Sequence, residues 1–416
     1  MRRRYRFFCR AQVCWSLLLV THAAYAGWEF SAPADPYRYW NTSVTVGGQY
    51  DDNFNSTEKN RESGVRFSSD IRFRATVPLE RFLAGVQYDY GVLYPRDTRL
   101  GGVEETHNVT VSANCTITPE LTLGLSETYI NSLQPELVEG PANAPINIVQ
   151  AGTYVYNNLV ANVNYALSRR WILSVAGAWD TWRYQVSSVA SNNDHDDYST
   201  IVSALYALDP RTSVGLNYRY VQTIFVNPGP FNGLNTDSDT GYLSIVRQFN
   251  PELSLTLNGG YTIQNSENGT TSTSPSAYGD LTYNYGTNST LSLTVGEALS
   301  SASLGVSQQF SSQENTTFAL HAEHRFTPRL RALADLTYVY SSFTSPLVPG
   351  VSVSPTEEAL TSHIGLRYAF REWLSAVLDY TYTQLTAPKT SLFGRSVQLI
   401  EPYNRNQVSL GMTLTY

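Results

Sequence analysis

The chain has 416 residues, with 28 Lys and Arg against 35 Asp and Glu and a formal net charge of −7. The first 26 residues hold five arginines and no acids, so the remainder carries 23 basic and 35 acidic residues and a net charge of −12. This balance argues against a nucleic-acid partner. Three cysteines, Cys9, Cys14 and Cys115, do not make a disulfide framework or a cysteine metal site, and we interpret Cys115 as a small packing residue.

The N-terminus has the order of a secretory signal peptide. Four arginines within residues 2–6 precede an apolar run near residues 15–20 and then Ala24-Tyr25-Ala26, which predicts cleavage after Ala26. The apolar run is shorter than the roughly 20 residues of a spanning helix, and no later run is long enough. If the mature protein crosses a membrane, we therefore expect it to do so by strands.

Short turn signals recur along the chain at spacings of 36 to 50 residues, four of which are 41. A near-constant period of this length marks a repeated supersecondary unit, and the alternating runs between the turns make each unit one hairpin. The turn signals are Val77-Pro78, Thr118-Pro119, Ser168-Arg169, Asp209-Pro210, Asn250-Pro251, Gly286-Thr287, Thr327-Pro328 and Arg371-Glu372.

The opposite ends of these hairpins carry longer polar stretches, at residues 52–63, 134–152, 227–236, 265–275, 344–357 and 386–402. Short turns at one end and long loops at the other are typical of outer-membrane barrels, whose short turns face the periplasm. Eight turns divide the chain into nine hairpins, which predicts an all-β, antiparallel up-and-down transmembrane barrel of about 18 strands, with 16 to 18 plausible. We expect a signal peptide at 1–26, a short periplasmic segment at 27–38 and the barrel at 39–416. The unit at 289–326 is the least clear, because residues 296–303 are weakly patterned and could hold a bulge or a turn.

The last ten residues alternate without exception between apolar and small or polar side chains. Tyrosines gather toward strand ends, where a ring with a wet hydroxyl suits the membrane boundary. Ser409, Gly411, Leu414 and Tyr416 resemble the C-terminal signal read by the bacterial barrel-assembly machinery. We therefore expect the cell outer membrane as the location, with its lipid, lipopolysaccharide and the assembly machinery as partners.

Residues 47–54, Gly47-Gly48-Gln49-Tyr50-Asp51-Asp52-Asn53-Phe54, resemble the outer-membrane porins of the β-barrel porin 2 type. The stretch 66–94 is also similar, with a short turn at Pro78-Leu79-Glu80-Arg81. The resemblance implies an outer-membrane barrel that in some members is associated with exopolysaccharide production or export, and it implies no catalytic residues. Asp51, Asp52 and Asn53 stand where a strand enters a loop, so ordinary turn chemistry is the favoured reading of this element.

Alternation also predicts which charged side chains face the lumen. A barrel of about 16 to 18 strands is wide enough to hold water, and charges inside it tune which solutes pass. Arg66, Arg72 and Arg74 could form a basic ladder on one strand, or these charges could be paired with neighbouring acids. The lumen candidates are Arg66, Asp70, Arg72, Arg74, Asp89, Arg219, Glu323, Arg325, Asp335, Arg367 and Asp379.

Other polar groups give weaker hypotheses. Asp194-His195-Asp196-Asp197 falls in a predicted outer loop and could bind a divalent cation, although an acidic, solvated loop is the favoured reading. No histidine stands in a nucleophile motif, so we expect no enzymatic activity, no cofactor and no metal; the histidines considered are His107, His195, His321, His324 and His363.

The leading functional hypothesis is a channel that passes small hydrophilic solutes or a secreted polysaccharide, in the second case with export components as partners. The alternative is a structural or adhesive barrel with an occluded lumen that binds through its outer loops. A secreted β-propeller shares the repeat length, but nine blades would be unusual. About a dozen residues separate Ala26 from the first strand, which argues against the plug of an energy-coupled receptor.

Overall fold

The computed structural model describes residues 39–54, 56–95, 102–132, 137–138, 147–148, 153–185, 187, 190, 193–227, 235–286, 288–301, 310–346, 356–386, 390–392, 395–397 and 402–416. The predicted signal peptide, its cleavage residues Ala24 and Ala26, and the segment 27–38 lie outside the described residues and stay predictions. No described residue belongs to a helix long and apolar enough to cross a bilayer.

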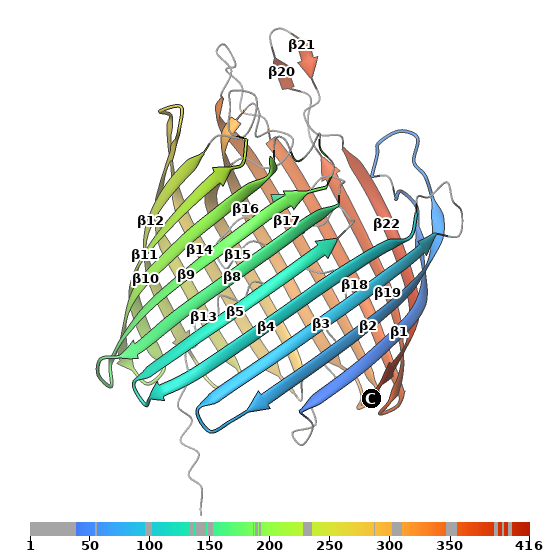
Figure 1. The fold of residues 1–416 in the computed structure, drawn as a ribbon, viewed down its shortest axis with the longest axis horizontal. Helices are drawn as coiled ribbons and strands as arrows, with labels where there is room; N and C mark the ends of the chain where they lie inside the picture. The colour runs from blue at the N-terminus through green and yellow to red at the C-terminus, as the bar shows by residue number, and fades with distance from the viewer. Residues whose placement is uncertain are drawn as a thin grey trace, which may run out of the picture.

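Eighteen strands form one closed barrel in which every neighbouring pair is antiparallel (Figure 1). β1 pairs with β2 on one side and with β22 on the other, so the first and last strands close the wall. The prediction of an up-and-down barrel of about 18 strands is confirmed. The strands of the barrel are β1 (Trp40–Asp51), β2 (Gly64–Pro78), β3 (Phe82–Pro95), β4 (Glu104–Thr118), β5 (Leu121–Ser132), β8 (Tyr154–Ala166), β9 (Trp171–Tyr184), β10 (His195–Asp209), β11 (Thr212–Phe225), β12 (Thr236–Gln248), β13 (Leu253–Ser266), β14 (Thr271–Tyr285), β15 (Ser289–Ser301), β16 (Phe310–Arg325), β17 (Leu330–Pro346), β18 (Thr356–Arg371), β19 (Leu374–Thr386) and β22 (Tyr403–Thr415).

Two small two-stranded sheets lie outside this wall, β6 (Leu137–Val138) with β7 (Asn147–Ile148), and β20 (Thr390–Leu392) with β21 (Arg395–Val397). Both belong to connections at the end opposite the short turns, the upper end in Figure 1. That end carries the longer connections and is the extracellular end of a barrel of this kind.

The predicted short turns lie at or beside strand ends, and in several of them a polar side chain supplies a local hydrogen bond. Asn250 accepts bonds from the backbone N–H groups of Glu252 and Leu253, at 2.9 and 2.7 Å. Thr327 accepts a bond from the N–H of Leu330 at 3.0 Å in the same way. Side chains that bind the backbone two and three residues ahead reverse the chain without help from the rest of the fold.

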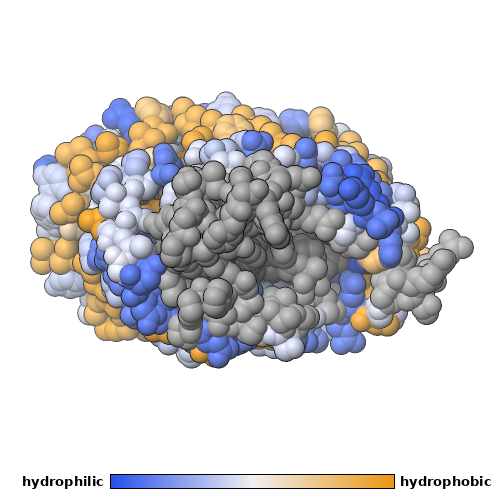
Figure 2. Space-filling model, turned by 90° about the horizontal axis from the view of Figure 1, so that it is seen from above, coloured by the Kyte–Doolittle hydropathy of each residue, from blue (hydrophilic) through white to orange (hydrophobic). Residues whose placement is uncertain are grey.

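Side chains alternate between two environments along the strands. On β2, Phe67, Ile71 and Phe73 are exposed, whereas Arg72 and Arg74 lie on the opposite face. Seen from above in Figure 2, hydrophobic residues lie around the outer rim of the barrel. The exposed apolar face is therefore the outside, and the polar face lines the lumen.

The closing seam requires two glycines that face each other. Gly47 on β1 pairs with Gly411 on β22, and a Cβ added to Gly47 would lie 2.5 Å from the carbonyl oxygen of Leu410. A Cβ on the neighbouring Gly48 would meet nothing nearer than 3.8 Å. The close approach at the seam thus depends on Gly47 and not on Gly48.

We expect Gly47→Ala to lower the free energy of unfolding by about 1 to 3 kcal/mol through overpacking. Gly48→Ala is the matched control and should behave as the unchanged protein does. The measurement is the urea concentration at which the folded, heat-modifiable gel band disappears. Equal midpoints for the two variants would contradict the close approach.

Candidate functional site

The lumen is the candidate site, and all eleven charged residues predicted to face it lie on the inner face. Asp379, for example, stands between the exposed Leu378 and Tyr380, and Arg219 follows the exposed Tyr218. Their positions are Arg66, Asp70, Arg72 and Arg74 on β2, Asp89 on β3, Arg219 on β11, Glu323 and Arg325 on β16, Asp335 on β17, Arg367 on β18 and Asp379 on β19. Their role in selecting solutes stays a prediction.

Several of these charges are paired across neighbouring strands. Arg72 contacts Asp89 at 2.6 Å, and Arg66 contacts Glu104 on β4 at 3.0 Å. Arg66 and Arg72 are therefore not an uncompensated ladder. Glu104 was missed by sequence reasoning, because only the folded sheet brings β4 within reach of an arginine on β2.

Two histidines flank one carboxylate on the inner wall. Nδ1 of His321 lies 2.5 Å from Asp335, and Nδ1 of His363 lies 3.1 Å from the other oxygen of the same carboxylate. The Asp335 and His321 side chains are 34% and 41% exposed. A partly exposed carboxylate inside a closed wall shows that this part of the lumen is open to water. The sequence signal was present, since His321, Asp335 and His363 all fall on inward positions of consecutive strands.

Arginines approach one another through the lumen. Arg367 interacts electrostatically with Arg331 on β17 and with Arg72 on β2. β2 and β18 are separated along the wall by β19, β22 and β1, so the electrostatic interaction between Arg367 and Arg72 runs across the interior. Arg331 also contacts Glu323 at 3.4 Å. The short-turn half of the lumen is thus a vestibule with mixed charge and a local concentration of arginine.

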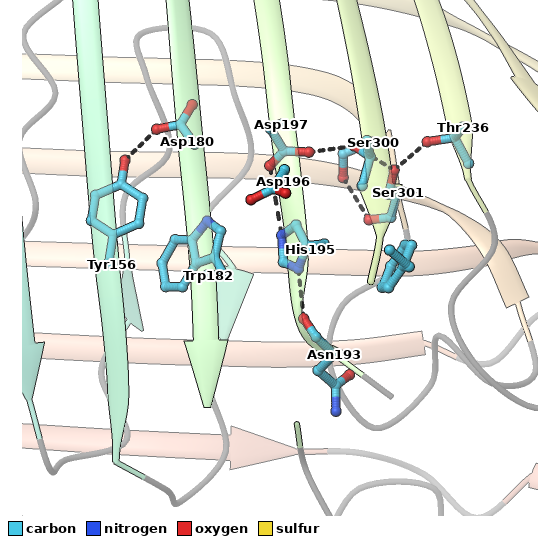
Figure 3. Close-up of polar contacts among 12 residues, drawn as sticks. Tyr156, Asp180, Trp182, Asn193, His195, Asp196, Asp197, Thr236, Ser300 and Ser301 are labelled. Carbon is cyan, nitrogen blue, oxygen red and sulfur yellow. Dashed lines mark hydrogen bonds and ion pairs between the residues drawn. The ribbon is translucent and has the colours of Figure 1, made fainter. Parts of the chain in front are cut away.

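Aromatic side chains line a different part of the inner wall, near the long-loop end of β8 to β11. The His195 ring stacks on Trp182 with ring centroids 6.1 Å apart and lies 5.3 Å from Phe225. Tyr156 donates a hydrogen bond of 2.7 Å to the buried Asp180 (Figure 3). This wall is a packed, hydrogen-bonded surface rather than a set of free binding groups.

The run from Asp194 to Asp197 is not the solvated loop that the sequence predicted. His195, Asp196 and Asp197 begin β10, because the alternating pattern extends two or three residues further than the acidic composition suggested. Each acid has its own partner: Asp194 accepts a bond from the N–H of Tyr184 at 2.8 Å, and Asp196 contacts Arg183 at 2.7 Å. Burial raises the pKa of Asp194 above its usual value. The described residues contain no group of three or more His, Cys, Asp or Glu able to hold a metal.

Several inward side chains in the long-loop half of the barrel are buried. Val339, Phe343, Ala359 and Leu385, on inward positions of β17 to β19, are 1 to 4% exposed. Residues 298–301 of β15 and 312–315 of β16, which we name the inner flap, lie on the lumen side of β12 and β14, while residues 312–315 stay paired with β17. Ser301 of the flap reaches Thr236 on β12, with their hydroxyl oxygens 2.7 Å apart. The flap narrows the extracellular side of the lumen.

The element Asp51-Asp52-Asn53 joins the first strand of the barrel to the last. Arg405 on β22 donates through Nε to both carboxylate oxygens of Asp51, at 3.1 and 2.9 Å, and both side chains are buried. Asp52 accepts bonds from the backbone and the side chain of Asn406, each at 2.6 Å. Asn53 donates its N–H to Asp51 at 3.0 Å, which is the expected turn chemistry. The element therefore caps its loop and also fastens β1 to β22.

A closed antiparallel barrel with an even number of strands, an apolar outer face and short turns at one end is the architecture of bacterial outer-membrane proteins. The chain is an outer-membrane β-barrel. The predicted location in the outer membrane is confirmed.

No family model matches the chain, and no curated protein matches it either. The resemblance of residues 47–54 to the β-barrel porin 2 type therefore stays a prediction. Among solved structures, the outer-membrane protein OpdK of Pseudomonas aeruginosa is similar with a TM-score of 0.45 and 11% identity, over 91% of this chain and 99% of that chain. The siderophore receptor PirA of Pseudomonas aeruginosa is similar with a TM-score of 0.42 and 13% identity, over 92% of this chain and 81% of that chain. The siderophore receptor PirA of Acinetobacter baumannii is similar with a TM-score of 0.43 and 8% identity, over 90% of this chain and 80% of that chain.

Removing Arg405 alone should be costly, because Asp51 would stay buried without its cation. We expect Arg405→Met to lower the free energy of unfolding by about 3 to 5 kcal/mol, and the double variant Asp51→Leu with Arg405→Met to recover most of that loss. The urea midpoint of the heat-modifiable band measures both.

The control is Arg183→Met, whose contact with Asp196 is partly exposed and should matter by less than about 1 kcal/mol. If Arg405→Met unfolds at the same urea concentration as the control, the buried pair does not hold the seam.

Proposed function

We propose that the protein is a channel for small hydrophilic solutes, entered from the periplasm through the charged vestibule and narrowed at the extracellular side by the inner flap. The observation that carries this proposal is the partly exposed charge inside a closed wall, at Asp335 and His321. An ionised group buried away from water costs several kcal/mol. A barrel of 18 strands belongs to the size class that leaves an aqueous lumen.

We favour small solutes over a polymer as the cargo because of the extracellular half of the lumen. There the inner flap lies inside the wall, and the inward side chains of β17 to β19 are buried. A secreted polysaccharide is the cargo that the resemblance of residues 47–54 implies, and we place it second for this reason. Its test is passage of a labelled oligosaccharide into proteoliposomes.

The rival is an occluded barrel that serves a structural or adhesive role through its loops. The same buried inward residues, Val339 and Phe343 at 1% exposure, favour it. Reconstitution in planar bilayers separates the two functions. Discrete conductance steps from a folded, heat-modifiable preparation support the channel, and a folded preparation without steps over a wide voltage range supports the occluded barrel.

Arginines of the vestibule should set ion preference. A unit charge about 4 Å from a passing ion changes the energy of that ion by about 1 kcal/mol in water. Replacing both Arg331 and Arg367 by Gln should therefore lower the chloride-to-potassium permeability ratio by at least about twofold. The measurement is the reversal potential in a salt gradient.

Arg183→Gln removes an arginine that lies outside the lumen and is the matched control. It should leave the reversal potential where it was. A double variant that also leaves it unchanged would show that ions do not pass the arginine cluster.

A further inference from the structure

β14 and β15 separate before either strand ends. Their pairing runs from Tyr285↔Ser289 to Ala277↔Glu297 and stops there. β14 nevertheless continues to Thr271 and stays paired with β13, while β15 continues to Ser301 and stays paired with β16. Six residues of β14, 271–276, thus form an edge that β15 does not cover.

Beyond this point the inner flap packs against the inner wall of strands that are not its neighbours. Ser301 contacts Thr236 on β12 at 2.7 Å (Figure 3). It also contacts Thr223 on β11 at 3.4 Å and the amide of Gln264 on β13 at 3.3 Å. Three strands, β12 to β14, separate β11 from β15 along the wall. Strands lie about 4.8 Å apart, so these contacts require that β15 has turned into the lumen.

The second arm of the flap follows the same path. The Ser312 hydroxyl on β16 lies 2.9 Å from that of Ser272 on β14, and Ser274 donates a hydrogen bond to Glu314. Ser272 and Ser274 are buried and alternate with the exposed Thr271 and Thr273. β16 therefore passes on the lumen side of β14.

One face of β15 faces outward in its lower part. In the flap, the same face of β15 touches the inner wall. Leu291 and Val295 of β15 are exposed on the outer face, and the same alternation continues to Leu299 and Ser301. Leu299 is buried in the present arrangement. The sequence of β15 is thus equally suited to continuing in the wall, with Leu299 outside.

The register fixes what that continuation would be. Extending the pair Ala277↔Glu297 places Leu299 opposite Pro275 and Ser300 opposite Ser274. Pro275 offers no N–H to a partner, which weakens pairing at this edge and is a common feature of exposed edge strands. The edge of β14 can therefore accept β15 without holding it firmly.

We propose that the inner flap is a gate with two positions, one packed against the inner wall of β11 to β14 and one in which residues 298–301 of β15 pair with residues 273–276 of β14. The first position narrows the lumen and the second widens it. This inference rests on the proposed channel function.

The contacts that hold the closed position suit a reversible device. They are hydrogen bonds of hydroxyl, amide and carboxylate groups, each of which contributes only modestly to stability once exchange with water is counted. Glu297 and Glu314 also share a hydrogen bond at the base of the flap. Two carboxyl groups in contact favour separation whenever both are ionised.

The test uses a cysteine pair that locks the closed position. In a background with Cys115→Ala, Thr236→Cys with Ser301→Cys places two thiols where hydroxyl oxygens are 2.7 Å apart, within reach of a disulfide. We expect the oxidised protein to hold the low conductance level, and reduction to raise the mean conductance by more than about twofold, reversibly.

A matched control keeps the same chemistry within the fixed wall. Thr240→Cys with Thr262→Cys joins β12 to β13, where the hydroxyl oxygens are 2.9 Å apart. Oxidation of this pair should leave conductance unchanged. If the flap pair also gives the same conductance when oxidised and reduced, the flap is not a gate.

A second pair reports the open position without any conductance. Pro275→Cys with Leu299→Cys can join only when β15 lies beside β14, because at present Pro275 faces outward and Leu299 is buried against the inner wall. Oxidation of the folded protein should form this disulfide, read as a gel shift after proteolysis. If this disulfide does not form, the two-position gate is wrong. If it forms in a barrel that never conducts, the flap moves but the protein is not a channel.

Discussion

Closure of the wall by β1 and β22 is the constraint on which the rest of the structure depends. In lipid no water is present to satisfy backbone N–H and C=O groups, so a strand edge left open in the apolar band would cost several kcal/mol per group. The first and last strands meet this requirement with nine paired positions, from Ser43↔Thr415 to Asp51↔Gln407. Gly47 allows the backbones to approach, and Asp51 with Arg405 fastens the extracellular end. Only a closed wall divides the alternating side chains into a lipid face and a lumen, so the charged vestibule is a consequence of the seam.

The separation of β14 from β15 marks where this constraint ends. Glu297 is the last residue of β15 that pairs with β14, and it stands eight residues after the first such residue, Ser289. At about 3.3 Å per residue and a tilt of about 40°, eight residues climb roughly 20 Å, which is most of the ~25 Å apolar band. About two more residues reach the top of that band, so most of the β14 edge lies where water can satisfy it, and the chain can turn inward at little cost. The serines of the flap match this position, because their hydroxyl groups can bind either the inner wall or water.

The sequence was sufficient for the barrel and insufficient for the contacts inside it, for a physical reason. Turn residues such as Asn250 and Thr327 act on the backbone two or three positions ahead, and lipid-facing alternation is local as well, so strand number and faces could be predicted. The partner of Asp51 is 354 positions away, and no local pattern points to Arg405. The inner flap escaped prediction because Leu299 and Ser301 keep the same alternation whether β15 stays in the wall or leaves it.

Charge pairing and solute selection are compatible readings of the lumen. A pair such as Arg72 with Asp89 removes most of the cost of placing an arginine on a protein wall, yet both side chains remain 20 to 24% exposed and keep a field in the water beside them. What a passing ion experiences is the sum of such pairs, so the distribution of charge matters more than any single residue. Arg367 interacts electrostatically with Arg331 and, across the interior, with Arg72. The buried Asp180 lies on the wall of β9, where Tyr156 and Asn158 bind it. Arg72 and Arg331 are paired but partly exposed to the vestibule, whereas Asp180 is buried in the wall, so the wet part of the lumen can favour anions.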